Sequence, residues 1–382
     1  MKQSILLVLG SILLLCGCQK EPMIHLSEAK KSEINAKVNQ EKEKTSDELA
    51  TGVKTDFDSS TFTPYDESKT FDDISQFLIA QPNQRKKLSN QSSAFSLYMD
   101  YVDGGLGLIQ MREVNGDKVN NKYYSWNTQQ MIQLANEKTS AFPMNHLNQV
   151  HENPITEMVL LQAPLTKGTS WQAADGIEAT ITNLYKEIKL TQGTFHDVIE
   201  VTYHSADYEI HYYYAKNNGV VAIWQIPASE SEKQQHWQVT DMQMNAKMTQ
   251  AMPIYRPDES NKGQVTLDSI DMSWQTNDQV AMIYTRLFQT LGWISENITV
   301  NSVSLDNDVL MIDFSSGVVA AINQHPATEA GVIPAMVETL ASHFGVKKVK
   351  LSVNGLGLLP DNLPYPDGGV WTANQVNENN EN

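Results

Sequence analysis

Cysteine is almost absent from this sequence of 382 residues, and its two cysteines, Cys16 and Cys18, both stand near the start. Beyond position 18 no thiol remains to form a disulfide, to bind zinc or an iron–sulfur cluster, or to act as a nucleophile. A disulfide-stabilised scaffold and a cysteine-dependent enzyme are therefore excluded for the rest of the chain. We expect stability to come from apolar burial, for which the hydrophobic content of 41% is adequate.

The apolar run at the start of the sequence is too short to cross a membrane. It follows a basic residue, Lys2, extends from Ile5 to Leu15, and ends in small residues. About eleven residues span roughly 16 Å as a helix, whereas the hydrocarbon core of a bilayer is about 30 Å thick. This layout is typical of an export signal, which we assign to residues 1–17.

The residues that end this run, Leu15-Cys16-Gly17-Cys18, resemble the bacterial lipobox. The resemblance implies cleavage before Cys18 and attachment of fatty-acyl chains such as palmitate to Cys18. Several acyl chains, unlike a single one, hold a protein stably on a bilayer. We therefore expect a lipoprotein on the extracytoplasmic face of the cell membrane. An ordinary signal peptide with incidental cysteines is the alternative.

Positive charge is scarce, because 28 Lys and Arg face 45 Asp and Glu and give a formal net charge of -17. A field of this sign repels nucleic-acid phosphates and anionic lipid headgroups. Nucleic acid is thus not expected as a partner. Contact with the membrane is assigned to the N-terminal lipid.

Two polar segments flank the folded part of the sequence. Residues 18–70 have few apolar positions, too few to offset the entropy of ordering, and we expect a solvated tether that sets the reach of the protein. A helix formed on a partner is the alternative. Residues 374–382 are predicted to be a polar tail.

Short apolar stretches with an alternating pattern, broken by Gly, Asn and Asp, predict a mainly antiparallel β domain over residues 71–252. One helix is expected near residues 128–138. The order of Pro164–Trp171, Gly193–Phe195 and Tyr213–Val221 resembles a β-sheet module of exported bacterial proteins, and implies no chemistry. This segment contains the aromatic residues Trp171, Tyr212, Tyr214 and Trp224. They either pack on one face of the sheet or line a groove for a lipid, peptide or glycan.

The last segment, residues 263–373, changes to a helical period. Asn277-Asp278 is predicted to cap a helix that ends at Gly292, and a second helix is expected from about Glu329 to Phe344. Because proline is tolerated in the first turn of a helix, Pro334 places the start of its regular part near Gly331 to Ile333. A hairpin of strands 298–305 and 309–314 lies between them, and a strand over 347–354 follows. The order αββαβ predicts a two-layer sandwich, so the fold class of the whole chain is expected to be α+β.

Five motifs of this segment resemble the GerMN domain, found in the sporulation and germination protein GerM: Val300-Asn301-Ser302-Val303, Leu310–Ser315, Glu338-Thr339-Leu340, Val346–Val349 and Leu351–Gly355. The resemblance implies a fold like the ring-building motifs of secretion systems. It also implies a membrane-attached envelope protein without catalytic activity. GerM has a tandem pair of these domains, whereas this sequence has one clear copy.

Motifs for catalysis, metals or cofactors are not found in the sequence. It has no Gly-x-Ser-x-Gly, no His-Glu-x-x-His, no P-loop and no dinucleotide fingerprint, and its histidines are scattered. Asp306, Asp308 and Asp313 crowd one hairpin, but the glycine and glutamate of a calcium-binding EF-hand loop are absent. We therefore expect no catalytic residue, no metal and no cofactor.

Two functions remain open. The first is a non-catalytic envelope lipoprotein that docks with other envelope proteins or with itself, related to sporulation or germination if the organism forms spores. The basic stripe Lys347, Lys348 and Lys350 would then meet an acidic partner, although a solvated strand face is the simpler explanation of these lysines. The alternative is a ligand-binding lipoprotein that uses the β-rich domain to hold a lipid, peptide or glycan.

Overall fold

The computed structural model describes residues 58–374, except 117, 139–142, 154–156 and 259–263. The predicted signal peptide, Cys18, most of the tether and the tail beyond 374 lie outside these residues. The chain forms two compact units, each built from separate segments. Unit 1 contains the residues up to Phe77, Leu88–Ala94 and Leu161–Asp241; unit 2 contains Leu78–Lys87, Phe95–Leu160 and the residues from Met242 onward. The predicted domain boundaries at 71–252 and 263–373 stay predictions.

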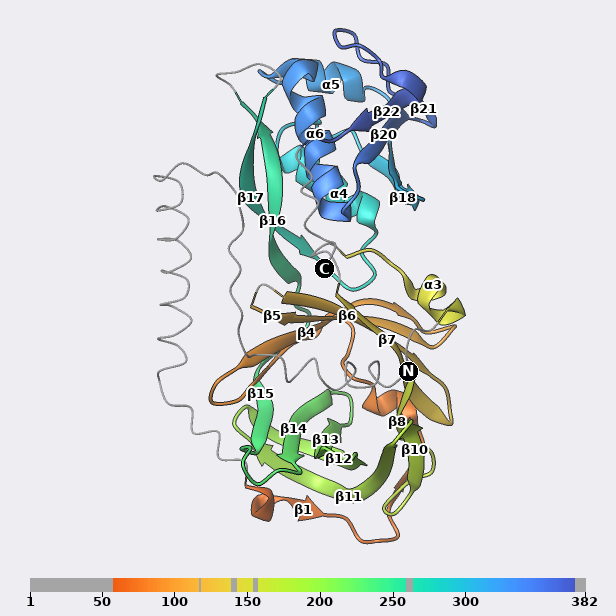
Figure 1. The fold of residues 1–382 in the computed structure, drawn as a ribbon, viewed down its shortest axis with the longest axis vertical. Coiled ribbons are helices and arrows are strands. Elements are labelled where there is room, and N and C mark those ends of the chain that lie inside the picture. The colour runs from red at the N-terminus through yellow and green to blue at the C-terminus, as the bar shows by residue number, and fades with distance from the viewer. Residues whose placement is uncertain (1–57, 117, 139–142, 154–156, 259–263, 375–382) are drawn as a thin grey trace. The chain divides into compact units, whose positions relative to one another are not determined.

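Unit 1 is built on antiparallel strands joined mostly by tight turns (Figure 1). The strands pair in the order β1 (Thr63–Pro64), β11 (Ile177–Leu190), β12 (Gly193–His204), β13 (Tyr208–Ala215), β14 (Gly219–Pro227) and β15 (Gln235–Gln243), and β10 (Ser170–Ala174) also pairs with β11. Smaller elements are η1 (Ser59–Thr61), η2 (Ile74–Phe77) and the pair β2 (Thr70–Phe71) and β9 (Leu165–Thr166). Residues 58–70, which the predicted tether includes, thus hold η1 and β1.

Unit 2 begins with an antiparallel meander. Its strands are β4 (Ala94–Asp103), β5 (Leu108–Asn115), β6 (Lys118–Trp126) and β7 (Gln130–Lys138), and helix α3 (Leu147–Glu152) follows. A long hairpin of β16 (Met248–Pro257) and β17 (Val265–Trp274) comes next in this unit. The strands β3 (Arg85–Ser89) and β8 (Met158–Gln162) have residues in both units.

The helix predicted near residues 128–138 is wrong, because this segment is strand β7. Met131, Leu134 and Ala135 are all buried, at a spacing that fits one face of a helix. Pairing with β6 shifts register at this point, since Tyr123 pairs with Ala135 and Tyr124 with Gln133. Leu134 is the extra residue of a β-bulge, so it can be buried together with its neighbour Ala135 in an extended strand.

The C-terminal part of unit 2 combines three helices with a five-stranded sheet. The helices are α4 (Val280–Thr290), α5 (Val318–Gln324) and α6 (Thr328–Phe344). The sheet contains β18 (Val300–Asp306), β19 (Val309–Phe314), β20 (Lys348–Val353) and β21 (Leu356–Gly357), with β22 (Val370–Thr372) paired to β20 beyond the short η3 (Asp367–Gly369). β19 and β20 are parallel and the other pairs antiparallel. The predicted helices, the hairpin and the last strand are therefore present.

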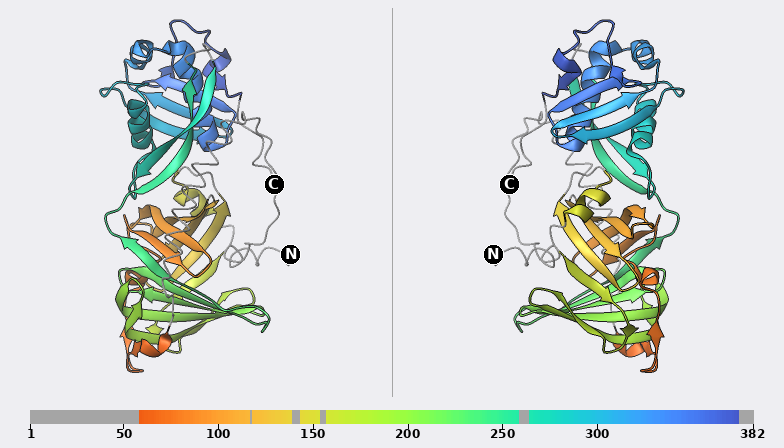
Figure 2. Two further views of the ribbon diagram at one scale, coloured as in Figure 1. Left: turned by 90° about the vertical axis from the view of Figure 1, so that its left-hand side faces the viewer. Right: turned by 90° about the vertical axis from the view of Figure 1, so that its right-hand side faces the viewer.

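The predicted fold class, α+β with a two-layer αββαβ sandwich, is wrong. Strands make up 50% of the structure and helices 17%, and the strands form large antiparallel sheets. Helix α6 contacts β19 and β20, and it also contacts the hairpin β16–β17 that runs along it (Figures 1 and 2). The hairpin covers the α6 face that a two-layer sandwich would leave to solvent.

Contacts with the hairpin β16–β17 explain why polar residues of α6 are buried. The Thr339 hydroxyl accepts a hydrogen bond from the Tyr255 amide at 2.9 Å. His343 Nε2 donates to the Pro253 carbonyl at 2.6 Å, so Nδ1 accepts from the Tyr284 hydroxyl at 2.8 Å. Burial lowers the pKa of His343 to about 4, and the Pro253 hydrogen bond opposes this only in part. The imidazole is therefore neutral in the folded protein.

Candidate functional site

One face of the five-stranded sheet carries no buried side chain. Alternation along the strands sends Val300, Leu310, Ile312, Val349 and Leu351 into the core, where all are buried. The side chains on the opposite face of the sheet are exposed or half-buried, and we call this surface the open face. It consists of Ser302, Ser304, Asp306, Val309, Met311, Asp313, Lys348, Lys350, Ser352, Val370 and Thr372.

The three predicted contact lysines occupy different positions relative to this surface. Lys348 is exposed and Lys350 half-buried, and both belong to the open face, while Lys347 is exposed just before β20 begins. β20 lies inside the sheet, between β19 and β22. A partner could thus reach Lys348 and Lys350 only through the open face and not through a strand edge. Their role as partner contacts stays a prediction.

The edge of this sheet is strand β18. It pairs with β19 on one side, and no other strand of the described chain pairs with its second side. Five of its seven residues are exposed, and Leu305 retains 43% of its accessible surface. Unpaired main-chain groups along such an edge are a template for a further strand.

Asp313 fixes the geometry of this edge from the neighbouring strand. Its carboxylate accepts hydrogen bonds from Asn301 Nδ2 at 2.8 Å, Ser352 Oγ at 2.7 Å and the Gly355 amide at 2.7 Å. Burial acts to raise the pKa of Asp313, but these hydrogen bonds outweigh it and lower the pKa below its ordinary value. The aspartate thus joins β18, at the register shift between Val300 and Ser302, to the turn after β20.

A hollow of about 510 Å³ lies beside the edge, within unit 2. Asn301, Ser302 and Val303 form its β18 side. Its other lining residues come from β4, α3 and the start of α4 and include several amides: Tyr101, Val102, Asp103, Asn145, Leu147, Asn148, Asn277, Gln279, Val280 and Ala281. Amide side chains both donate and accept hydrogen bonds, so the walls can bind main-chain groups.

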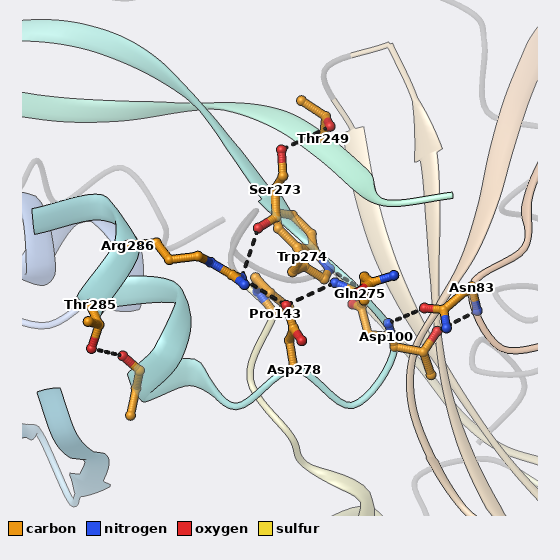
Figure 3. Close-up of polar contacts among 12 residues, drawn as sticks. Asn83, Asp100, Pro143, Thr249, Ser273, Trp274, Gln275, Asp278, Thr285 and Arg286 are labelled. Atoms are coloured by element: carbon orange, nitrogen blue, oxygen red, sulfur yellow. Dashed lines mark hydrogen bonds and ion pairs between the residues drawn. The ribbon is translucent and has the colours of Figure 1, made fainter. Parts of the chain in front are cut away.

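The segment between β17 and α4, part of which lines the hollow, is fixed by side-chain hydrogen bonds, and those of Asp278 are drawn in Figure 3. Asp278 accepts from Arg286 Nη2 at 2.8 Å and from the Gln275 amide at 3.1 Å. Asn277 pairs with Val102 through both side-chain atoms, accepting from its amide at 2.9 Å and donating to its carbonyl at 3.0 Å. The predicted capping of α4 by Asn277-Asp278 is therefore wrong, because Gln279 is the N-cap residue and makes no side-chain capping bond.

Thr285 connects α4 to the first residue of the edge strand. Its hydroxyl donates to the Ala281 carbonyl at 2.9 Å and accepts from the Val300 amide at 2.8 Å. The main-chain donor of Val300 is thus already satisfied. The open part of the edge begins after this residue.

A second polar cluster lies in unit 1, around the carboxylate of Glu200. Oε1 of this buried residue accepts from His211 Nδ1 at 2.8 Å and Tyr213 at 3.0 Å, and Oε2 from Asn183 at 2.9 Å and Tyr185 at 2.8 Å. Burial opposes ionisation, but the hydrogen bonds of His211, Asn183 and Tyr185 lower the pKa of Glu200. The carboxylate is therefore held ionised.

His211 lies between two carboxylates, because its Nε2 is 2.7 Å from Glu209 Oε1. Burial acts to lower the pKa of His211, yet Glu200 and Glu209 together raise it above its ordinary value. A protonated ring donates from both nitrogens and has no lone pair for use as a base. The Thr202 hydroxyl, 3.1 Å from His211 Nδ1, belongs to a buried residue. This arrangement stabilises charge and offers no activated nucleophile.

The two tryptophans of the predicted ligand groove pack against other side chains, and Trp171 is buried while Trp224 is half-buried. Trp171 is buried in the core of unit 1. The indole of Trp224 stacks on His211 with ring centroids 5.0 Å apart and meets His236 edge-on at 5.2 Å. Neither tryptophan lines the hollow beside β18. The ligand-binding alternative gains no support from these positions.

Over the described ranges, no group of three His, Cys, Asp or Glu side chains is placed to hold a metal ion. Among the same residues, no helix is both long and apolar enough to cross a membrane.

Comparisons with solved structures give weak similarities. An exported protein with a YmcC-like fold from Bacteroides fragilis is 10% identical and has a TM-score of 0.27, and the match covers 44% of this chain and 99% of that chain. A protein from Chlamydia trachomatis is 12% identical and has a TM-score of 0.20, and the match covers 45% of this chain and 91% of that chain. These TM-scores are too low to support an argument. No curated protein matches the chain.

A family model gives a clearer result. Residues 253–358 match the family described as Germane: Sporulation and spore germination. The matched segment contains β18, β19, α6 and β20 and overlaps the segment that resembles the GerMN domain. It covers less than half of the chain. Within those limits, residues 253–358 are similar to a sporulation and germination domain.

Proposed function

We propose that this chain is an exported, lipid-anchored envelope protein that docks with other envelope proteins through its C-terminal segment during sporulation or germination. The observation that carries the proposal is the exposed and half-buried surface of the Germane-like segment, where the open face meets the edge of β18 that no second strand of the described residues pairs with. A sheet with one packed and one open face can bind another protein without a deep pocket.

The anchoring part of the proposal rests on Cys18 and the lipobox-like residues before it. The experiment is palmitate labelling of cells that produce the intact chain or the Cys18→Ser variant. The intact chain should be labelled and should sediment with membranes, whereas the variant should lose both properties. A Cys16→Ser variant is the matched control, and it should behave as the intact chain does. Equal labelling of all three chains, or none, would contradict anchoring at Cys18.

The docking part is tested by gentle cross-linking in the protein's own cells, followed by affinity purification and mass spectrometry. The intact chain is compared with a triple variant of Lys347, Lys348 and Lys350 to Ser, which changes exposed or half-buried side chains only. A triple Lys→Arg variant keeps the charge and serves as the control. A discrete set of envelope proteins that is retained with Arg and depleted with Ser supports an acidic partner at the open face. Identical sets of cross-linked proteins for the intact chain and both triple variants would show that the lysines do not contribute to the interface.

A chain lacking residues 263–382 extends the test to the whole segment. Because this deletion also removes the partner strand of β16, its folding is checked first by circular dichroism. Envelope partners that remain bound to a folded truncated chain would contradict docking through the C-terminal segment.

A further inference from the structure

We propose that the edge of β18 binds an extended segment of a partner protein, which joins the sheet as an additional strand and places a basic side chain beside Asp306. This inference rests on the proposed docking function and names the chemistry of the partner. Its occupant is a peptide backbone in the extended conformation.

The pairing of β18 with β19 shows which main-chain groups are available. Asp306 pairs with Val309 across the two-residue turn Asn307-Asp308. The residues that close such a turn form a hydrogen-bonded pair, and hydrogen-bonded and non-bonded pairs alternate along antiparallel strands. The main-chain groups of Ser304 and Asp306 therefore point toward β19. Those of Val303 and Leu305 point toward the open edge, where an incoming strand would bind them.

The middle of the edge lacks the usual protection against strand addition. Exposed edges are ordinarily blocked by charged side chains, proline or bulges. In β18 the register shift lies at one end, next to Ser302, and the first charge lies at the other end, at Asp306. The residues between them are uncharged and contain no proline. The edge is thus regular over a length that an extended segment can pair with.

Charge and space near the edge define the partner further. Asp103 is the charged residue among those that line the hollow, and Asp306 and Asp308 are exposed at the hairpin end. A strand added beside β18 would bring its side chains to about 5 Å from those of Asp306, close enough for an ion pair with Lys or Arg. A second copy of this chain is disfavoured, because both copies carry the formal net charge of -17.

The test uses peptides selected from a random twelve-residue library on the immobilised full chain, purified in detergent. Their affinities are measured by fluorescence anisotropy for the intact chain and four variants. Leu305→Pro removes one outward N–H and leaves the bonds to β19, whereas Leu305→Ser removes the same side chain and keeps the N–H. Asp306→Lys reverses a charge at the edge, and Asp271→Lys makes the same change on an exposed residue of β17.

We expect the selected peptides to be rich in Lys or Arg and poor in proline. Leu305→Pro should weaken their binding about fivefold or more, as loss of a main-chain hydrogen bond predicts, while Leu305→Ser should stay within about twofold. Asp306→Lys should weaken binding and Asp271→Lys should not. Failure to select any peptide, or equal binding by all five chains, overturns the inference. If Leu305→Pro proves unfolded by circular dichroism, the two charge variants decide alone.

Failure of this inference is distinguishable from failure of the proposed function. Partners that cross-link in cells to the intact chain and equally to Leu305→Pro and Asp306→Lys would refute strand addition and leave docking in place. The absence of envelope partners for the intact chain would refute docking itself.

Discussion

Removing Arg112 should strongly destabilise unit 2, because this residue neutralises a buried aspartate. The side chains of Arg112 and Asp100 are both 0% exposed, and Nη2 lies 2.9 Å from Asp100 Oδ2. Arg112 Nε donates to the same oxygen at 3.0 Å. Trp274 Nε1 donates to Oδ1 at 2.9 Å, and the guanidinium lies 5.2 Å from the Trp274 ring centroid.

The size of the effect follows from the burial of both charges. Arg112→Met leaves the carboxylate in the core without its cation, a change that costs about 3–5 kcal/mol. A typical domain has only about 5–15 kcal/mol of stability, so the loss is severe. Replacing both residues, as Asp100→Leu with Arg112→Met, removes the uncompensated charge. We expect the double variant to recover most of the lost stability, since apolar replacement of a buried pair is often neutral.

The assay is urea unfolding of the full chain followed by circular dichroism. Hydrogen exchange of the β4 and β5 amides assigns the change to unit 2. The expected order of stability is intact chain, double variant and single variant, with the double variant closer to the intact chain. A single variant that costs less than about 1 kcal/mol would refute the reasoning, as would a double variant no more stable than the single one.

Three further predictions concern pH and backbone geometry. The folded pKa of His343 is about 4 and its ordinary value is 6.5, so below pH 6.5 the unfolded chain gains a proton that the folded chain does not bind. Stability of unit 2 should fall by up to about 3 kcal/mol toward pH 4, and His343→Gln should flatten this slope in urea titrations. The pKa of His211 is raised, so its contribution should be complete below pH 6.5 and should disappear as pH rises through the folded pKa. Urea midpoints of unit 1 from pH 6 to 9 should show this decline, and a decline that persists in His211→Gln would assign it elsewhere. Gly107 has φ 65° and a Cβ there would lie 2.2 Å from the Trp126 carbonyl oxygen, so Gly107→Ala should cost more than about 2 kcal/mol in the same assay. A urea midpoint equal to that of the intact chain would contradict this prediction.

Local periodicity identified the type of several elements in the C-terminal part of unit 2. The second predicted hairpin strand matches β19, and the predicted second helix ends at Phe344, as α6 does. The predicted start of its regular part, near Gly331 to Ile333, is wrong, because α6 begins at Thr328 and contains Pro334 in its interior. Periodicity failed at Leu134, because a β-bulge places neighbouring residues on one side and imitates a helix. A single shifted residue is invisible in a hydrophobic pattern unless the partner strand is known.

The architecture could not be predicted because it depends on contacts distant in the chain. Nothing in the sequence of α6 shows that Tyr255 and Pro253 of the hairpin will cover its polar residues Thr339 and His343. Polar residues on a helix ordinarily indicate a solvated face, so the burial of Thr339 and His343 follows only from their contacts with the hairpin.

The candidate site was predicted only in part. The sequence singled out Lys348 and Lys350 by their alternation with apolar residues, and the structure places both on the open face. The edge position of β18 was missed, because strand order within a sheet follows from long-range pairing. Asp313 appeared in a motif, but its bonds to Asn301 and Gly355 require the folded strands.

Docking through the Germane-like segment is tested most directly by site-specific photo-cross-linking in the protein's own cells. A photoreactive amino acid is placed at Ser304 or Lys348 on the open face, or at the exposed control positions Asp271 in unit 2 and Glu178 in unit 1. We expect discrete adducts with envelope proteins from Ser304 and Lys348 and none from the two control positions. Adducts of equal yield at all four positions, or adducts confined to Glu178, would contradict it.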